Sequence, residues 1–507
     1  MTGRRGLAAL LLVVPLSACT GEASAPTPAA SPTPAPTADP LAAPGADELA
    51  AAEDDPRRDS FYPGVGDPVV DALHYGLDLR WAPEDRELSG TAAVTFRATA
   101  DADEVRLDLA RAMGVQEVTL DGQAAPYTQL RRDLVVDASG LGGVRADEVH
   151  RLVVTYAGTP APVPAPSART DLAEAGMRVT ADGWLWTLQS PYGAFTWFPV
   201  HDQPSDRALY DVRVDVPAPW TGVSGGALVS SEVVRGDSGS RRVTTWELDE
   251  PAAAYLTTLA VGDYVATERE TASGLPVTTW TPRGDRAAAA DLAFSAEAVD
   301  WIEDTLGPYP FATVGGVLVD ADSAMETQTL PTYGDTEYTR SELVVLHELV
   351  HQWYGDAVTP TDWRDLWMSE GMTTYLQLCW EVEVTGRSWR AVLGEAQQYA
   401  RDSRALAGPP GDPDPRQYGS STVYYGPALM WHTLRADVGE DAFWSAVRAW
   451  PAEGGPSADR EEYLAWLVDR LAGDTDTDLP AFFDTWLGDR ELPRFDPVPL
   501  PDPPPLT

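Results

Sequence analysis

The residues best suited to chemistry lie together in one short stretch of the chain. His347-Glu348-Leu349-Val350-His351 places two histidines four residues apart with an acid beside the first. On a helix, residues four apart share one face, so both imidazoles can reach a single Zn²⁺ while Glu348 projects beside them as a general base. The alternative is a pair of surface histidines on an amphipathic helix.

A catalytic zinc needs a third protein ligand and an open fourth position. Glu370 lies 19 residues after His351, within Leu366-Trp367-Met368-Ser369-Glu370-Gly371. Alone, it would be interpreted as a solvated acid at a helix start. Its spacing from the histidines, and the nearby Trp363 and Trp367 that can keep the pocket dry, favour a metal ligand instead. We therefore predict one Zn²⁺ per chain, held by His347, His351 and Glu370.

The helix that carries the two histidines has recognisable ends. Ser341 is a suitable N-cap and Gly355 a suitable terminator, and apolar residues recur between them with helical spacing. Further along, the Ala-rich stretch 287–304 is helical in pattern, whereas 314–320 resembles a strand. The sequence therefore predicts a mainly helical catalytic domain over residues 266–492, followed by a Pro-rich tail over 493–507.

The first half of the chain has a different pattern. Stretches such as 91–96 and 152–156 alternate apolar and polar residues with period two, and Asp121-Gly122 is a typical hairpin turn. Residues 59–265 are therefore predicted to form a β domain. The whole chain is expected to be an α+β, multidomain protein.

The N-terminus indicates export. Arg4 and Arg5 precede an apolar run and then Leu16-Ser17-Ala18-Cys19, which resembles the lipobox of bacterial lipoproteins. We predict a signal peptide over 1–19, lipidation of Cys19 at the outer face of the cell membrane of a bacterium, and a Pro/Ala-rich disordered tether over 20–58. The alternative is an ordinary cleaved signal with an incidental cysteine. With Cys19 lipidated, Cys379 is left alone, so no intrachain disulfide is expected.

The charge composition of the chain excludes one class of binding partner. The 507 residues include 78 acidic and 36 basic side chains, which gives a formal net charge of −42. Such a field repels nucleic acid, so no nucleic-acid partner is expected. The hydrophobic content of 44% is ordinary for a folded protein.

Several segments together resemble one protein family. HELVHQWYGD followed by LWMSEG resembles the HExxH-x18-E signature of the aminopeptidase N family of gluzincin metallopeptidases, which includes leukotriene hydrolase. Residues 197–206 are similar to the family's FPxxDxPxxK region, with Arg207 in the lysine position, and YLTTLAVGDY at 255–264 is similar to the strand that closes its first domain. The resemblance, which covers about 70–495, implies a β-sheet saddle domain followed by a thermolysin-like domain with zinc on His347, His351 and Glu370.

The family's second signature, GxMEN, is matched by Ser323-Ala324-Met325-Glu326-Thr327. The resemblance implies that Glu326 binds the free α-amine of the substrate, with Ala324 and Met325 beside it. Ser323 and Thr327 replace the family's Gly and Asn. Another amine-binding residue of the family aligns with Ser190, with Gln189 one step away. The alternative for Glu326 is an exposed acid at a strand end.

The family's oxyanion donor is a tyrosine, and the segment 423–429 resembles its surroundings. The register set by Ala428 and Leu429 makes Tyr424 that residue, with Tyr425 as the alternative, and either ring could instead serve packing alone. The resemblance thus implies a zinc-dependent aminopeptidase acting on peptides outside the cytoplasmic membrane. Few residues follow Leu492 where many members have a C-terminal helical domain, so longer substrates are expected to enter. A zinc endopeptidase and a non-catalytic, tethered peptide-binding lipoprotein remain as alternatives.

Overall fold

The computed structural model describes residues 39–42, 44–236 and 239–506. The predicted signal peptide, Cys19 and about half of the predicted tether lie outside the described residues. Among the described helices, none has the length and apolar character needed to span a bilayer.

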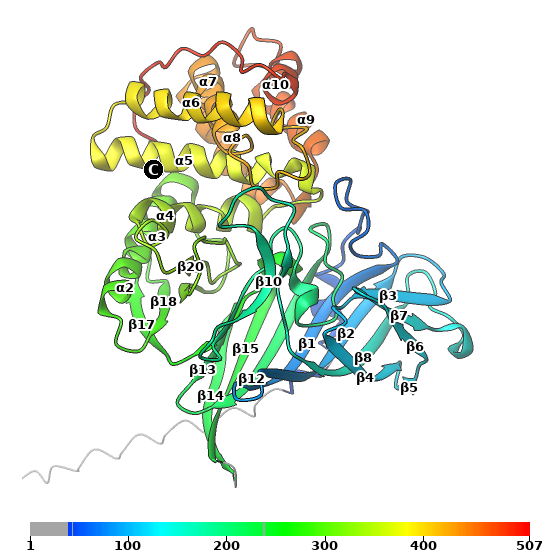
Figure 1. Ribbon diagram of the computed structural model, residues 1–507. Helices are drawn as coiled ribbons and strands as arrows, with labels where there is room; N and C mark the ends of the chain where they lie inside the picture. The colour runs from blue at the N-terminus through cyan, green and yellow to red at the C-terminus, as the bar shows by residue number, and fades with distance from the viewer. Residues whose placement is uncertain (1–38, 43, 237–238, 507) are drawn as a thin grey trace, which may run out of the picture. The chain divides into compact units, whose positions relative to one another are not determined.

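The β domain is built on an eight-stranded sheet (Figure 1). Its strand order is β14-β15-β12-β1-β2-β8-β4-β5, and only the β1–β12 pair is parallel among these pairs. The bounds are β1 Val70–Ala82, β2 Glu87–Ala98, β4 Met113–Leu120, β5 Gln123–Ala124, β8 Val149–Gly158, β12 Arg207–Pro217, β14 Ala227–Gly236 and β15 Gly239–Ala253.

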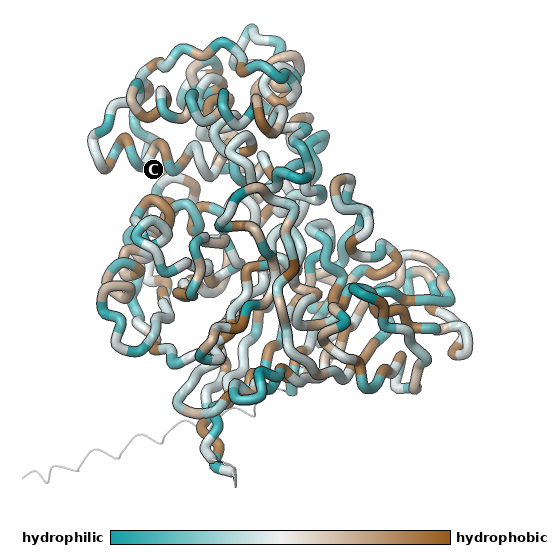
Figure 2. The backbone as a smooth tube through the Cα atoms, in the orientation of Figure 1, coloured by the Kyte–Doolittle hydropathy of each residue, from teal (hydrophilic) through white to brown (hydrophobic). Residues whose placement is uncertain are grey.

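The period-two pattern of the sequence produces the strands that it predicts. In β8, Leu152, Val154 and Tyr156 are buried and the residues between them are partly exposed. Asp121 and Gly122 form the two-residue connection between β4 and β5, both with positive φ, as a type I′ hairpin turn requires. Figure 2 shows hydrophobic and hydrophilic residues interspersed along the sheet.

Two smaller sheets complete the β domain. A five-stranded sheet has the order β13-β16-β11-β10-β9, with β9 Val163–Pro164, β10 Glu174–Val179, β11 Leu185–Leu188, β13 Thr221–Ser224 and β16 Leu259–Gly262. A three-stranded sheet has the order β3-β7-β6, with β3 Glu104–Asp108, β6 Tyr127–Gln129 and β7 Asp133–Asp137. The segment that precedes β10 and the loop after β11 both reach the cavity described below.

The second half combines a four-stranded sheet with helices, so the expected α+β architecture is confirmed (Figure 1). The sheet order is β17-β18-β19-β20, with β17 Tyr264–Glu270, β18 Pro276–Pro282, β19 Val314–Val319 and β20 Thr332–Gly334. A two-stranded sheet pairs β21 Thr359–Pro360 with β22 Ser457–Ala458. The helices are α2 Arg286–Asp291, α3 Ser295–Leu306, α4 Glu342–Val350, α5 Trp367–Thr385, α6 Trp389–Ala407, α7 Tyr425–Val438, α8 Glu440–Glu453, α9 Arg460–Leu471 and α10 Leu479–Gly488.

Helix packing brings the functional elements together. Helix α4 packs against α3 and α5, and α5 packs against α7. Their contact surfaces are buried apolar side chains, among them Leu346, Leu349, Met372, Leu376 and Leu429. Since α4, α5 and the start of α7 carry residues singled out above, the core of the second half positions the site.

The chain before β1 differs from expectation. The sequence predicts a disordered tether as far as residue 58, but residues 44–58 include α1 (Ala46–Ala50) and pack against the β domain. The Asp54 N–H donates to Asp71 Oδ1 at 3.1 Å, and Asp54 Oδ2 accepts from the Arg207 N–H at 2.8 Å. Ala52 is buried beside Leu73. These long-range contacts override a composition typical of a linker.

Candidate active site

The helix that carries the histidines ends in a tight turn. Helix α4 begins after Ser341, whose hydroxyl donates to the Tyr338 carbonyl rather than capping the helix. After His351 the backbone leaves the helix, and Gly355 has a φ of +128°, which glycine adopts at little cost. This turn brings the Tyr354 carbonyl oxygen within hydrogen-bond distance of His351 Nδ1.

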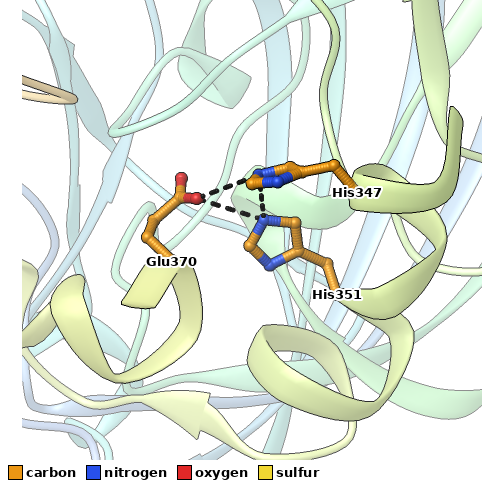
Figure 3. A group of neighbouring side chains, drawn as sticks. All are labelled: His347, His351 and Glu370. Carbon is orange, nitrogen blue, oxygen red and sulfur yellow. Dashed lines mark hydrogen bonds and ion pairs between the residues drawn. The ribbon is translucent and has the colours of Figure 1, made fainter. Parts of the chain in front are cut away.

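Three side chains from two helices converge on one point (Figure 3). His347 Nε2 lies 3.2 Å from Glu370 Oε2, His351 Nε2 lies 3.3 Å from the same oxygen, and the two Nε2 atoms are 3.2 Å apart. His347 and His351 come from α4 and its end, and Glu370 comes from the first turn of α5. The structure thus brings the three predicted ligands together.

The remaining ring nitrogens fix how the histidines point. His347 Nδ1 lies 2.9 Å from Gln377 Oε1, and His351 Nδ1 lies 2.9 Å from the Tyr354 carbonyl oxygen. Because both partners are acceptors, each Nδ1 carries the proton and donates it. Each Nε2 therefore faces the point between the three side chains, where it ligates a metal once any proton on it has left.

This donor set fits zinc in type and in spacing. Tetrahedral coordination with bonds of about 2.0 to 2.1 Å separates the ligand atoms by about 3.3 to 3.4 Å. The three separations here are 3.2, 3.2 and 3.3 Å. Two imidazoles and one carboxylate with an open side are also the donors of catalytic zinc sites. The residues present therefore fit the predicted metal.

The charges of the site depend on one another. Burial by itself would raise the pKa of Glu370, but His351 and hydrogen bonds from both histidines hold that pKa below its ordinary value. Burial by itself would lower the pKa of His351, but Glu370 in particular raises it to about 10. The carboxylate is thus ionised and prepared to balance a positive charge.

Two more carboxylates face the same cavity, whose volume is about 230 Å³. Glu326 and Glu348 both line it and are only 8% and 7% exposed. Burial raises the pKa of Glu348 well above its ordinary value, and Glu326 and Glu370 add to this effect. Burial likewise raises the pKa of Glu326. A carboxyl with a raised pKa beside a metal site suits a general base, which must both take and release a proton.

The segment that carries Glu326 is held by backbone pairing. Met325 forms a bridge with Thr332, its N–H donating to the Thr332 carbonyl at 2.8 Å. Gln352 Nε2 donates to the Glu326 carbonyl at 3.1 Å. Ser323, Ala324 and Met325 line the cavity with Glu326. The Thr327 hydroxyl, in the family's Asn position, instead donates to the Leu330 carbonyl.

The two candidates for the second amine-binding position separate clearly. Ser190 lines the cavity, and its hydroxyl is hydrogen-bonded to that of Tyr418. Gln189 is fully buried and does not line the cavity. Its amide donates to the Ala254 and Thr257 carbonyls and accepts from Trp197 Nε1. Gln189 therefore has a structural role, because these hydrogen bonds hold its side chain in the interior, away from the cavity.

The two adjacent tyrosines also differ. The Tyr424 ring lies against His347, with 6.2 Å between ring centroids and 23° between planes. Tyr425 also lines the cavity but stacks on Tyr399 at 4.9 Å. Burial raises the pKa of Tyr424 well above its ordinary value, so the phenol stays protonated and can donate a hydrogen bond. Of the two, Tyr424 lies beside a metal-ligand candidate.

Sequence reasoning missed several residues that support the site. Gln377, seven residues after Glu370, shares its face of α5, and that spacing is a signal that could have identified it. Gln352 follows the second histidine and holds both the Glu326 carbonyl and Asp356. Arg169 and Tyr418 also line the cavity. No local pattern marks these two, since only the fold brings them near α4.

Models of two protein-family domains match the chain. The peptidase M1 N-terminal domain matches residues 71–256, and the peptidase family M1 domain matches residues 295–486.

Known proteins show the same likeness. Glutamyl aminopeptidase from Rattus norvegicus is 24% identical over 333 residues, which are 61% of this chain and 35% of that protein. Aminopeptidase N from Streptomyces lividans is 25% identical over 346 residues, covering 63% of this chain and 38% of its own length. This chain therefore matches little more than a third of these relatives.

Among solved structures, an M1 zinc metallopeptidase from Deinococcus radiodurans superimposes with a TM-score of 0.75 at 27% identity. The match covers 87% of this chain and 99% of that one. A mutant of that enzyme has been solved with a Tyr-Ser-Ala substrate bound.

Proposed function

Because the chain belongs to peptidase family M1, we propose that it is a zinc-dependent aminopeptidase that removes N-terminal residues from peptides. The resemblance to the aminopeptidase N family is confirmed by both domain matches. A zinc cofactor follows from the family and from the donor set of His347, His351 and Glu370.

The reaction needs water to attack a peptide carbonyl. Zinc, when bound, supplies a Lewis acid that polarises the carbonyl and makes the water more acidic. Glu348 follows His347 directly and faces the cavity, so it takes the proton of the attacking water and later gives it to the leaving amine. The burial that raises the pKa of Glu348 makes its carboxylate a stronger base for the first of these transfers.

Two further groups position the substrate. Tyr424 donates its phenol proton to the oxyanion that forms on the attacked carbonyl. Glu326 accepts the substrate's α-ammonium group, which fixes the chain end and selects the first peptide bond. Ser190 lines the same cavity and can accept a hydrogen bond from that ammonium group. The free amine is therefore the feature that the site recognises.

The arrangement of Glu326 beside the three-ligand triangle carries this proposal. The test is to follow the digestion of one peptide, free or N-acetylated, by mass spectrometry. An aminopeptidase removes residues one at a time from the free peptide and leaves the acetylated one intact. Internal cleavage of both forms would instead show an endopeptidase. Binding without cleavage by zinc-loaded protein would show a peptide-binding protein.

We also propose that the protein is exported and held by lipid at Cys19. The support is the charged start, the short apolar run and Leu16-Ser17-Ala18-Cys19. In the native host, Cys19→Ser should move the protein from the membrane fraction to a soluble or unprocessed form. A processed variant that still fractionates with membranes would contradict lipidation at Cys19.

A further inference from the structure

A segment of the β domain contacts the turn that leads into α7. Three hydrogen bonds join them: Tyr418 N–H to the Pro166 carbonyl at 2.9 Å, Ser167 hydroxyl to the Tyr418 carbonyl at 2.8 Å, and Arg169 to the Gly419 carbonyl at 3.1 Å. Gly419 has a φ of +65°, and Leu172 fills the space beside its α-carbon. The 166–172 segment therefore fixes the backbone of the turn.

The Arg169 side chain continues this contact to Tyr424. Its guanidinium is held in a two-point contact by Asp171, with Nε 3.2 Å from Oδ1. The same guanidinium places NH1 3.4 Å from the Tyr424 hydroxyl oxygen. A planar fork fixed on one side by a carboxylate presents its other N–H groups in a set direction. Arg169 is thus a rigid donor aimed at the phenol.

This donor determines what the phenol can do. When Tyr424 Oη accepts a hydrogen bond from Arg169, its own proton is left to donate elsewhere. The ring lies beside His347 on the cavity wall, so that proton is available on the side where the zinc ligands lie. Tyr424 also stands at the junction between the turn and α7, where its backbone depends on the turn.

We infer that Arg169 is a positioning residue: it and the 166–172 segment hold Tyr424 in place and direct its proton toward the reacting carbonyl. The inference rests on the proposed function, since it assigns a helper to the proposed oxyanion donor. On this inference the β domain both lines one wall of the cavity and, through Arg169, orients the Tyr424 side chain.

The kinetic test is a double-mutant cycle with Arg169→Gln and Tyr424→Phe on an aminoacyl-amide reporter. Arg169→Gln should lower kcat roughly tenfold to a hundredfold and change KM by less than about threefold, because a displaced donor acts on the transition state. In the Tyr424→Phe background the same change should cost less than about twofold. Losses that multiply, or an unchanged kcat, would overturn the inference.

Controls separate this role from general destabilisation. Arg213 forms a comparable ion pair with Asp78 within the eight-stranded sheet and is exposed to a similar degree, so Arg213→Gln should leave kcat unchanged. Asp171→Asn keeps the Arg169 guanidinium but removes the carboxylate that holds it. This variant should also lower kcat, by a smaller factor than Arg169→Gln. A normal kcat in Asp171→Asn would contradict the two-point positioning.

A crystal structure of Arg169→Gln makes the test independent of activity. We expect the Tyr424 ring to leave its place against His347 while the zinc ligands stay in position. A Tyr424 ring that stays in place would overturn the inference even if kcat falls in this variant. If the wild-type protein cleaves no reporter, the proposed function fails, and this structure still decides whether Arg169 holds Tyr424.

Discussion

Glu326 and Glu348 place carboxylate oxygens within 4.8 Å of each other and of a ring nitrogen of His351. Burial raises the pKa of both groups, and each lies close to the ionised Glu370. Three carboxylates in one small cavity need cations. Zinc and a substrate ammonium group are the two cations that the proposed reaction provides. The proximity of the two acids is thus explained if one serves the water and the other the amine.

The base is tested by Glu348→Gln. Glutamine keeps the shape but cannot take a proton, so turnover should fall at least roughly a hundredfold. Zinc content, measured by metal analysis, should stay at about one per chain because the ligands are untouched. In contrast, His351→Ala should lose both zinc and activity. Near-normal turnover in Glu348→Gln would mean that another group activates the water.

The amine contact is tested by Glu326→Ala. Removing the partner of a partly desolvated ammonium group should cost about 2 to 5 kcal/mol in transition-state stabilisation for free peptides. Any residual cleavage of N-acetylated peptides should hardly change. Tyr424→Phe is the control, because loss of the oxyanion donor slows both substrates alike. Equal losses for both substrates in Glu326→Ala would show that Glu326 does not bind the amine.

The hydrogen bond behind His347 is tested by Gln377→Ala. In this variant the hydrogen bond between His347 Nδ1 and Gln377 Oε1 is lost, so the imidazole ring is no longer held in its orientation. The affinity for zinc should therefore fall about tenfold to a hundredfold. Competition with a chromogenic chelator measures this change. Gln398→Ala, at an exposed position of α6, should leave the affinity unchanged. A similar zinc affinity in Gln377→Ala and the wild type would contradict the role of this contact.

A buried acid of the β domain gives a prediction about pH. Burial raises the pKa of Asp202 from 3.8 to about 7, and Asp108 adds to the effect. Between these values the folded state keeps a proton that the unfolded state has lost, so this group's stabilising contribution is lost as pH rises from about 4 to 7. Asp202→Asn does not titrate. The difference in the free energy of unfolding between Asp202→Asn and the wild type should therefore shift in favour of the variant, by about 1 to 3 kcal/mol, when the pH is raised from 5 to 7.

Urea unfolding of both proteins at the two pH values measures this difference. The exposed Asp85→Asn on the β1–β2 turn is the control, and its curve should run parallel to that of the wild type. If the free energy of unfolding of Asp202→Asn changed between the two pH values by the same amount as that of the wild type, Asp202 would be ionised in the folded protein.

The parts of this protein that could be predicted from sequence are those set by local geometry. His347 and His351 meet because four residues make about one helical turn. In β8, alternate side chains are buried, as the period-two pattern of the sequence requires. The sequence could not decide whether Gln189 or Ser190 faces the cavity, because adjacent residues in extended backbone point to opposite sides. Residues 44–58 escaped prediction because residues distant in sequence hold them, among them Asp71, Leu73 and Arg207. Arg169 escaped for the same reason.

Zinc-dependent cleavage at a free N-terminus is the central claim, and one measurement tests it most directly. The purified protein is assayed on a panel of aminoacyl-amide reporters before chelation, after chelation, and after return of one equivalent of zinc. The account predicts hydrolysis of at least one reporter, its loss on chelation and its recovery with zinc. Full hydrolysis by protein shown to contain no zinc, or no hydrolysis of any reporter by zinc-loaded protein, would contradict it.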